Sequence, residues 1–145
     1  MLIFTSSNMA GLAISEQPEV MTKWDSGELP NFFVDRGPAK RGMTCTSFSE
    51  KAQKQVVKLV QASFSPGSKL EPPRVESSDV GGCRGVHIRV DVRSKVGTEW
   101  TSDIRAASDG KTLYLFVLRV HKVNFEKNLE FYDKAMSTLR LAAAP

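Results

Sequence analysis

The sequence lacks a long apolar run, and this limits how the chain can meet a membrane. No stretch of about 18 apolar residues occurs in the 145-residue chain, so no transmembrane helix is predicted. The apolar start "MLIF" has no basic residues ahead of it, which is unlike an intact signal peptide and leaves open whether a targeting segment has been removed. The glycine stretch "GGCRG" lacks the Lys-Ser/Thr of a P-loop and precedes a predicted strand, which excludes a phosphate cradle.

Cysteine is also scarce, with only Cys45 and Cys83 present, and their spacing is not that of a zinc site. The two can form one disulfide or remain free buried thiols, and free thiols are favoured a priori. Cys83 precedes His87 in "GGCRGVHIRVDVR", which raises the hypothesis of a thiol enzyme. A Cys-His pair needs contact and an orienting group, and nothing in the sequence places one. A structural role for Cys83, in a glycine turn ahead of a strand, is therefore favoured.

The composition that remains is that of one globular domain. Hydrophobic residues make up 41% and charged residues 25% of the chain, and the net charge of +4 permits an acidic partner without requiring one. Residues 1–30 are punctuated by glycine and proline and are expected to form an irregular N-terminal arm, with Trp24 anchoring it. Residues 31–145 are expected to form the folded domain.

Hydrophobic periodicity predicts the elements of that domain. Val86, Ile88, Val90 and Val92 alternate with polar residues, as in a half-buried strand, and Asp109-Gly110 signals a hairpin. The predicted elements are strands at 31–37 and 42–49, a helix at 50–64 capped by Ser49, an edge strand at 74–76, strands at 86–93, 99–108 and 111–123, and a helix at 125–139 capped by Asn124. This order predicts an α+β fold, an α/β/α sandwich around a mainly antiparallel sheet.

Two outer rows of basic residues are candidates for a binding surface. His87, Arg89 and Arg93 share one face of their strand, and Arg119 and His121 share the parity of the apolar residues in theirs. If the two strands share a face, these five residues make a basic patch for an acidic partner, and the histidines are possible metal ligands. A solvated sheet end explains the same residues and is favoured, because two histidines fall short of a metal site.

Other chemistry is weakly signalled. Carboxylates are scattered and expected to be exposed, without a pair suited to acid–base catalysis; they are Glu71, Glu76, Asp79, Asp91, Glu99, Asp103 and Asp109. No nucleic-acid motif is present, and the aromatic residues beside basic ones read as core. No cofactor and no small-molecule substrate is expected.

The C-terminal part of the chain resembles the PsbP-like family. The resemblance lies in the hairpin "DGKTLY", the hydrophobic strand after it, Phe125 at the start of the last helix and the apolar end at residues 137–141, and with the upstream helix it extends over about residues 31–142. The hairpin carries one threonine more than the family's "DGKLY" pattern. The resemblance implies the same α/β/α fold and a non-enzymatic protein that acts by docking.

What the resemblance implies about function is a peripheral docking or assembly subunit of a photosynthetic membrane complex, in the thylakoid lumen. The family's basic docking residues lie mostly in an N-terminal arm. Here the nearest candidates are Arg36, Lys40 and Arg41, although the segment "DRGPAKRG" is not a motif match. The alternative is a soluble interaction domain of the Ran-binding type, in the cytoplasm or nucleus, or of the bacterial envelope lipoprotein type.

Overall fold

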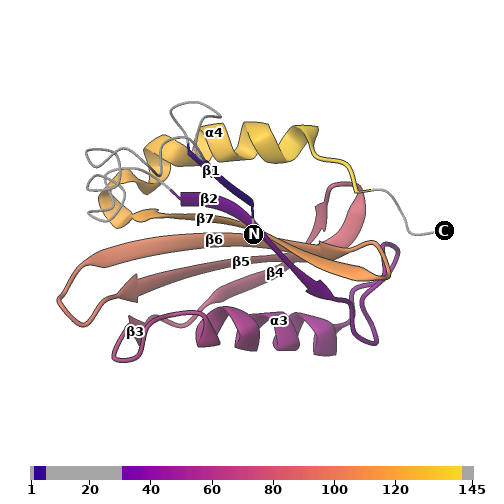
Figure 1. Cartoon of the computed structure of the whole chain (residues 1–145), viewed down its shortest axis with the longest axis horizontal. Coiled ribbons are helices and arrows are strands. Elements are labelled where there is room, and N and C mark those ends of the chain that lie inside the picture. The colour runs from indigo at the N-terminus through magenta and orange to yellow at the C-terminus, as the bar shows by residue number, and fades with distance from the viewer. Residues whose placement is uncertain (1, 6–30, 142–145) are drawn as a thin grey trace.

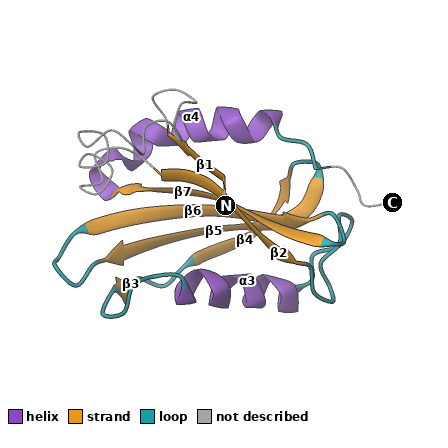
Figure 2. Ribbon diagram, viewed as in Figure 1, coloured by secondary structure: helices purple, strands orange, loops and turns teal. Residues whose placement is uncertain are grey.

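The computed structural model describes residues 2–5 and 31–141, in which an antiparallel sheet lies between two helices (Figures 1 and 2). Within these residues the sheet has seven strands in the order β1-β2-β7-β6-β5-β3, and β4 also pairs with β5. The predicted α/β/α sandwich is confirmed. The elements are β1 (Leu2–Thr5), β2 (Asn31–Pro38), α3 (Glu50–Ala62), β3 (Lys69–Leu70), β4 (Arg74–Val80), β5 (Cys83–Arg93), β6 (Glu99–Ser108), β7 (Thr112–His121), the 3-10 turn η1 (Lys122–Asn124) and α4 (Phe125–Thr138).

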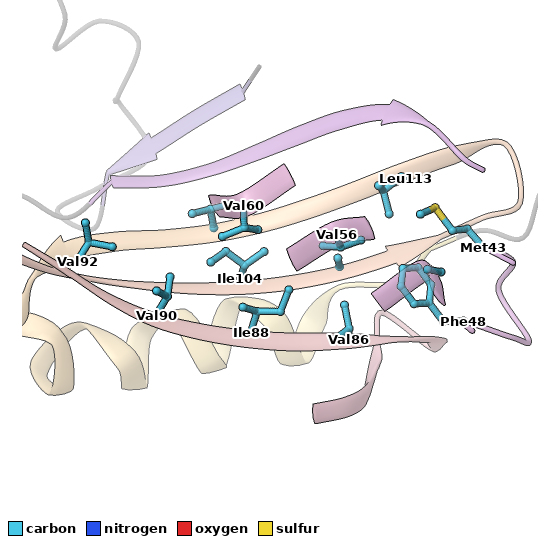
Figure 3. Packing of buried hydrophobic residues seen from close by; sticks show 13 residues of the cluster. Met43, Phe48, Val56, Val60, Val86, Ile88, Val90, Val92, Ile104 and Leu113 are labelled. Atoms are coloured by element: carbon cyan, nitrogen blue, oxygen red, sulfur yellow. The ribbon is translucent and has the colours of Figure 1, made fainter. Parts of the chain in front are cut away.

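Helix α3 covers one face of the sheet, here called the α3 face. Ser49 caps it as predicted, because its Oγ accepts a hydrogen bond from the Ala52 N–H at 3.1 Å. The helix buries Ala52, Val56 and Val60 against the inward row of β5. Figure 3 shows Val56 and Val60 in one layer with the labelled side chains of β5, β6 and β7, which form the first of two core clusters.

Helix α4 covers the opposite face, here called the α4 face. Tyr132 is fully buried at its centre, and the phenol donates a hydrogen bond to the Phe116 carbonyl oxygen at 2.8 Å. Phe125 and Met136 are buried on the same side of α4, and the helix predicted here is confirmed. Asn124 stands at the predicted start of the helix, but its side chain makes no capping hydrogen bond, because η1 already turns the chain there.

The hairpin between β6 and β7 forms where Asp109-Gly110 predicted it. Gly110 has φ of +102°, a left-handed conformation that glycine adopts without a Cβ clash. The Asp109 carboxylate accepts hydrogen bonds from the N–H groups of Thr112 at 2.7 Å and Lys111 at 2.8 Å. These backbone bonds hold the pKa of Asp109 below its ordinary value.

The strand predicted at 42–49 is wrong. Only Met43 and Phe48 pair, as an isolated bridge, and the residues between them form a tight turn. The Thr44 N–H donates to the Ser47 carbonyl oxygen at 2.9 Å, and the Ser47 N–H donates to the Thr44 hydroxyl at 3.0 Å. A β-branched residue with a hydroxyl group can thus favour a turn over a strand, because its side chain competes for backbone hydrogen bonds.

The expectation of free thiols is also wrong, because Cys45 and Cys83 form a disulfide. Cys83 is the first residue of β5, not part of a turn ahead of it, since β4 runs on to Val80 and pairs with β5 down to Cys83. The glycines at 81 and 82, both with positive φ, make the turn between these strands. Cys83 is fully buried, and its predicted structural role is confirmed.

The N-terminal arm is described only in part. Leu2–Thr5, expected within an irregular arm, form strand β1, which pairs with residues 31–34 of β2. Trp24, expected to anchor the arm, lies outside the described residues. Across the part of the chain that the structure describes, no helix has the length and apolar character needed to cross a membrane.

Candidate functional site: the groove beside helix α3

The five basic residues predicted to share a patch lie on two faces of the sheet. His87, Arg89 and Arg93 alternate with the buried valines of β5 and project on the α4 face. Arg119 and His121 follow the parity of the residues that face α3. The strands that carry them are separated by β6, and the two rows point to opposite sides. The combined patch, and with it a metal site shared by the two histidines, depended on a shared face and was not the favoured interpretation, and that condition is not met.

On the α4 face the basic residues converge on one buried carboxylate. Asp103 was expected to be exposed, but the structure buries it fully. Its Oδ2 accepts hydrogen bonds from His87 Nε2 at 2.7 Å and Arg89 Nε at 3.0 Å, and its Oδ1 accepts one from Arg105 Nε at 3.3 Å. Burial alone raises the pKa of Asp103, but the His87 hydrogen bond and the neighbouring cations outweigh it and lower the pKa below its ordinary value.

The cations of this cluster are satisfied within the protein. Arg105 also pairs with Asp133 of α4, and its guanidinium lies 4.7 Å from the Tyr132 ring centroid. His87 Nδ1 lies 3.1 Å from Glu76 Oε1, and Arg89 lies over the ring of Phe125 at 4.6 Å. Such a closed network joins the sheet to α4, so His87 and Arg89 serve the fold and leave little charge for a partner.

Two other predicted residues stand apart. Arg93 is exposed and pairs with Glu99 across the β5–β6 hairpin at 2.6 Å. His121 packs edge-on against Trp100, with ring centroids 4.4 Å apart. Their role in partner binding stays a prediction.

The α3 face carries the main concave feature. A groove of about 800 Å³ runs between α3 and strands β2 and β7, and this volume is typical of a binding site. Its floor is apolar, formed by residues of three strands that include Phe33, Leu115 and Val117. Leu59 of α3 is 51% exposed on its bank. This feature, called the α3 groove below, is the candidate functional site.

Arg119 lies in the wall of the α3 groove. Its Nε donates to the Ser102 hydroxyl at 3.1 Å, and its guanidinium lies 4.6 Å from the ring centroid of Phe64 and 5.8 Å from that of Phe33. Among the described residues no carboxylate forms an ion pair with it. Burial lowers the pKa of Arg119, as expected of a cation without a counter-charge.

Further charges surround the groove. Lys40 and Lys58 are exposed residues of its lining, and neither forms an ion pair within the described part of the chain. Asp35 is the carboxylate in the lining, and it accepts a hydrogen bond from the Arg36 N–H at 2.9 Å. Arg36 also lines the groove, but its register opposite Tyr114 assigns its side chain to the α4 face.

Of the residues predicted to bind a partner, Lys40, Arg119 and Arg36 line the groove, and Arg41 is exposed just outside its lining. Their role in binding stays a prediction. Lys58 was missed. Only the position of α3 over the sheet places Lys58 at the groove.

The described residues hold no cluster of three or more histidine, cysteine, aspartate or glutamate residues suited to a metal ion. The thiol-enzyme hypothesis fails for the oxidised protein, because both cysteines of the chain are joined in the disulfide. The groove itself contains no histidine, and Asp35 is its single carboxylate among the described lining residues.

Comparison with known proteins gives one reportable similarity. No protein-family model matches the sequence, and no curated protein matches it. The solution structure of cyanobacterial PsbP (CyanoP) from Synechocystis sp. PCC 6803 is similar, with 16% sequence identity and a TM-score of 0.48. The match covers 75% of this chain and 65% of the cyanobacterial chain, so this chain spans less than two thirds of the length of that protein. At this level the likeness is one of fold.

Proposed function

We propose that this protein is a non-enzymatic, peripheral docking subunit of a photosynthetic membrane complex and that its partner protein binds in the α3 groove. The observation that carries the docking proposal is Arg119. A partly buried guanidinium that meets no carboxylate of the described residues is costly in free energy, and an acidic partner removes that cost. The photosynthetic assignment rests on the sequence resemblance of the hairpin and last helix to the PsbP-like family.

The composition of the groove favours docking over catalysis. Acid–base chemistry needs a pair of groups that exchange a proton near neutral pH. The groove instead presents an apolar floor with the cations Lys40, Lys58 and Arg119. An apolar centre with charged margins is the usual composition of a protein interface.

The disulfide supports an oxidising location. Disulfides persist in secreted and envelope compartments and are rare in the cytosol and nucleus. The bond between Cys45 and Cys83 thus favours the thylakoid lumen over a Ran-type role in the nucleus. It favours a bacterial envelope protein equally, which stays as the second candidate.

A capture experiment tests the function. The tagged, oxidised full chain is incubated with detergent-solubilised photosynthetic membranes, and bound proteins are identified by mass spectrometry. The expected result is recovery of defined photosystem subunits by the wild type, with reduced recovery by a Lys40→Gln, Lys58→Gln variant. The matched control is a Lys54→Gln, Lys127→Gln variant in the same extract, because both residues are exposed cations outside the groove lining.

Each outcome decides between the candidates. If both variants recover photosystem subunits as well as the wild type does, docking occurs on another surface. If photosystem subunits are absent and an envelope protein is captured from bacterial membranes, the second candidate replaces the first. Binding to a Ran-type GTPase in place of either would return the protein to the nuclear-transport class.

A further inference from the structure

Three partly buried arginines project from the central strands, and only one of them has no carboxylate partner among the described residues. Arg89 and Arg105, on the α4 face, both contact Asp103. Arg119, on the α3 face, contacts a hydroxyl and two aromatic rings. The sheet provides Arg89 and Arg105 with a carboxylate. The lack of one at Arg119, among the described residues, is therefore a local property of the groove.

Two further polar atoms on this face are unsatisfied. Gln55 Oε1, on the α3 bank of the groove, and His121 Nε2, two residues after Arg119, are buried without a hydrogen-bond partner, and no other buried side-chain nitrogen or oxygen of the described residues is in this state. Buried polar groups in native proteins are nearly always paired. The α3 face therefore carries two polar atoms without a hydrogen-bond partner in addition to Arg119.

The α3 groove also continues past Arg119. A second hollow of about 370 Å³ lies beyond it, lined by Phe64, Val96 and Trp100 among others, and it shares Ser63 and Arg119 with the first. Arg119 thus lies between two adjoining hollows, the first with an apolar floor and the second lined by apolar residues together with several serines and Lys95. A ligand that used both would have its anionic group between two apolar parts.

We propose that the α3 groove binds an acidic segment of a partner protein in which apolar side chains flank a carboxylate, and that Arg119 is the residue that selects this carboxylate. This inference rests on the proposed docking function and specifies the chemistry of the partner. The carboxylate accepts hydrogen bonds from the guanidinium N–H groups of Arg119 that do not bond Ser102. The flanking apolar side chains fill the two hollows.

The distribution of charge favours a chain segment over a small carboxylate. One carboxylate neutralises Arg119, but it leaves two more cations of the groove unpaired. These are Lys58 on α3 and Lys40 after β2. Several acidic side chains along a segment can meet all three cations. The exposed Leu59 extends the apolar surface along the α3 bank and suits the same elongated occupant.

The experiment is a selection of random peptides by display on the oxidised full chain, followed by affinity measurements on the selected peptides. The expected peptides combine Asp or Glu with apolar residues on both sides. Arg119→Gln is expected to weaken their binding about 10-fold or more, and Arg119→Lys, which keeps charge but not the planar fork, by less. Lys58→Gln weakens binding and Lys54→Gln, on the same helix, does not.

Folding is checked independently, since Arg119 also packs on Phe64. An unchanged melting temperature of the oxidised Arg119→Gln protein, or binding by Arg119→Lys that stays closer to the wild type than that of Arg119→Gln, shows that the groove is intact. Chemical-shift mapping with a selected peptide is expected to move the Arg119 Nε–Hε and Gln55 side-chain signals.

The proposal is overturned if the selection yields no peptide, if the peptides lack acidic residues, or if Arg119→Gln binds them as well as the wild type. Binding to anionic lipid vesicles with no peptide selected would replace a protein segment by a lipid headgroup and also overturn it. Acidic peptides without photosystem capture would leave this chemistry standing and remove the photosynthetic assignment. If Arg119→Gln still captures photosystem subunits, the photosynthetic assignment stands and the role of Arg119 in selecting a carboxylate is removed.

Discussion

At the scale of single residues, Asp103 and Arg119 show how the face of a sheet determines the role of a charge. Asp103 faces α4, where His87, Arg89 and Arg105 surround it. Arg119 is on the neighbouring strand β7 but faces α3, where the surrounding groups are apolar. The charges of Asp103 and Arg119, one strand apart, therefore never meet. Asp103 pairs within the fold, whereas Arg119 pairs with no carboxylate of the described residues.

Asp103→Asn is expected to destabilise the protein by about 3–5 kcal/mol, because it removes the buried carboxylate that the partly buried Arg89, Arg105 and His87 share. The measurement is the free energy of unfolding in urea at neutral pH. Asp79→Asn serves as the control, since its pair with Arg84 is exposed on both sides and its loss costs less than about 1 kcal/mol. Equal effects of the two substitutions would contradict an organising role for Asp103.

The acid side of the stability curve follows from the lowered pKa of Asp103. A carboxyl whose folded pKa lies below its unfolded value, about 3.9, adds stability that is fully present above that value and is lost as pH falls through the folded pKa. The difference in free energy of unfolding between wild type and Asp103→Asn is therefore expected to be constant near neutrality and to shrink below about pH 4. A difference independent of pH down to acid unfolding would argue against a charged Asp103.

The sequence could not reveal Asp103 as buried, and the reason is physical. Burial of a carboxylate depends on cross-strand neighbours, here Arg89 directly opposite on β5. The available signal was the alternation of Thr101, Asp103 and Arg105 with residues that face α3. That alternation assigns a common face, but it does not say that α4 covers it.

At the scale of elements, hydrophobic periodicity predicted the helices and the main strands. It did not predict structure that depends on side-chain hydrogen bonds or on contacts between distant segments. The two helices, the β5 alternation and the β6–β7 hairpin were all predicted, because each depends on spacing within its own segment. The segment 42–49 failed because the Thr44 side chain bonds the backbone, and the disulfide failed because it depends on two distant segments. Strands β1 and β3 form only by pairing with a neighbour that the sequence does not identify.

The disulfide fixes the loop that leads from β2 to α3. It closes a separation of 38 residues, so its removal in Cys45→Ala, Cys83→Ala is expected to cost about 2–4 kcal/mol. The loop also carries Lys40 and Met43 to the α3 groove, so reduction is expected to weaken peptide binding as well. Melting temperature and peptide affinity, each with and without reductant, test this. Unchanged affinity in the reduced protein would show that the loop does not shape the groove.

Gly85 leaves no room for a side chain between β5 and β6. A Cβ at this position would lie 2.1 Å from the Ala106 carbonyl oxygen, so Gly85→Ala is expected to destabilise the protein by about 1–3 kcal/mol or more. Gly37→Ala is a matched control, because a Cβ there meets nothing within 4 Å and its φ is not positive. Thermal unfolding of both variants measures the contrast, and similar melting temperatures would mean that β5 and β6 separate without cost.

At the scale of the whole molecule, the sandwich has two faces with different tasks. The α4 face is closed by an internal ion network, whereas the α3 face has a groove along one side of its helix. The layer order was predicted, but which face stays open depends on how far α3 extends over β2 and β7. That is a matter of tertiary packing and leaves no trace in any single segment.

Salt provides a test of this asymmetry. The net charge of +4 attracts an acidic partner over a distance, and exposed Lys58 contributes to that attraction, which about 0.5 M salt screens to a few ångströms. Arg119 acts inside the groove, where screening is weak. The effect of Lys58→Gln on peptide affinity is therefore expected to vanish between about 50 mM and 500 mM salt, whereas the effect of Arg119→Gln persists.

The measurement is a titration of one selected peptide by calorimetry at several salt concentrations for the wild type and both variants. Lys54→Gln corrects for the loss of one charge from the whole field, because it removes the same charge from the same helix outside the groove lining. If the Arg119→Gln effect fades with salt in step with that of Lys58→Gln, Arg119 acts as a surface charge. In that case long-range attraction alone, and not a carboxylate seated in the groove, would account for binding.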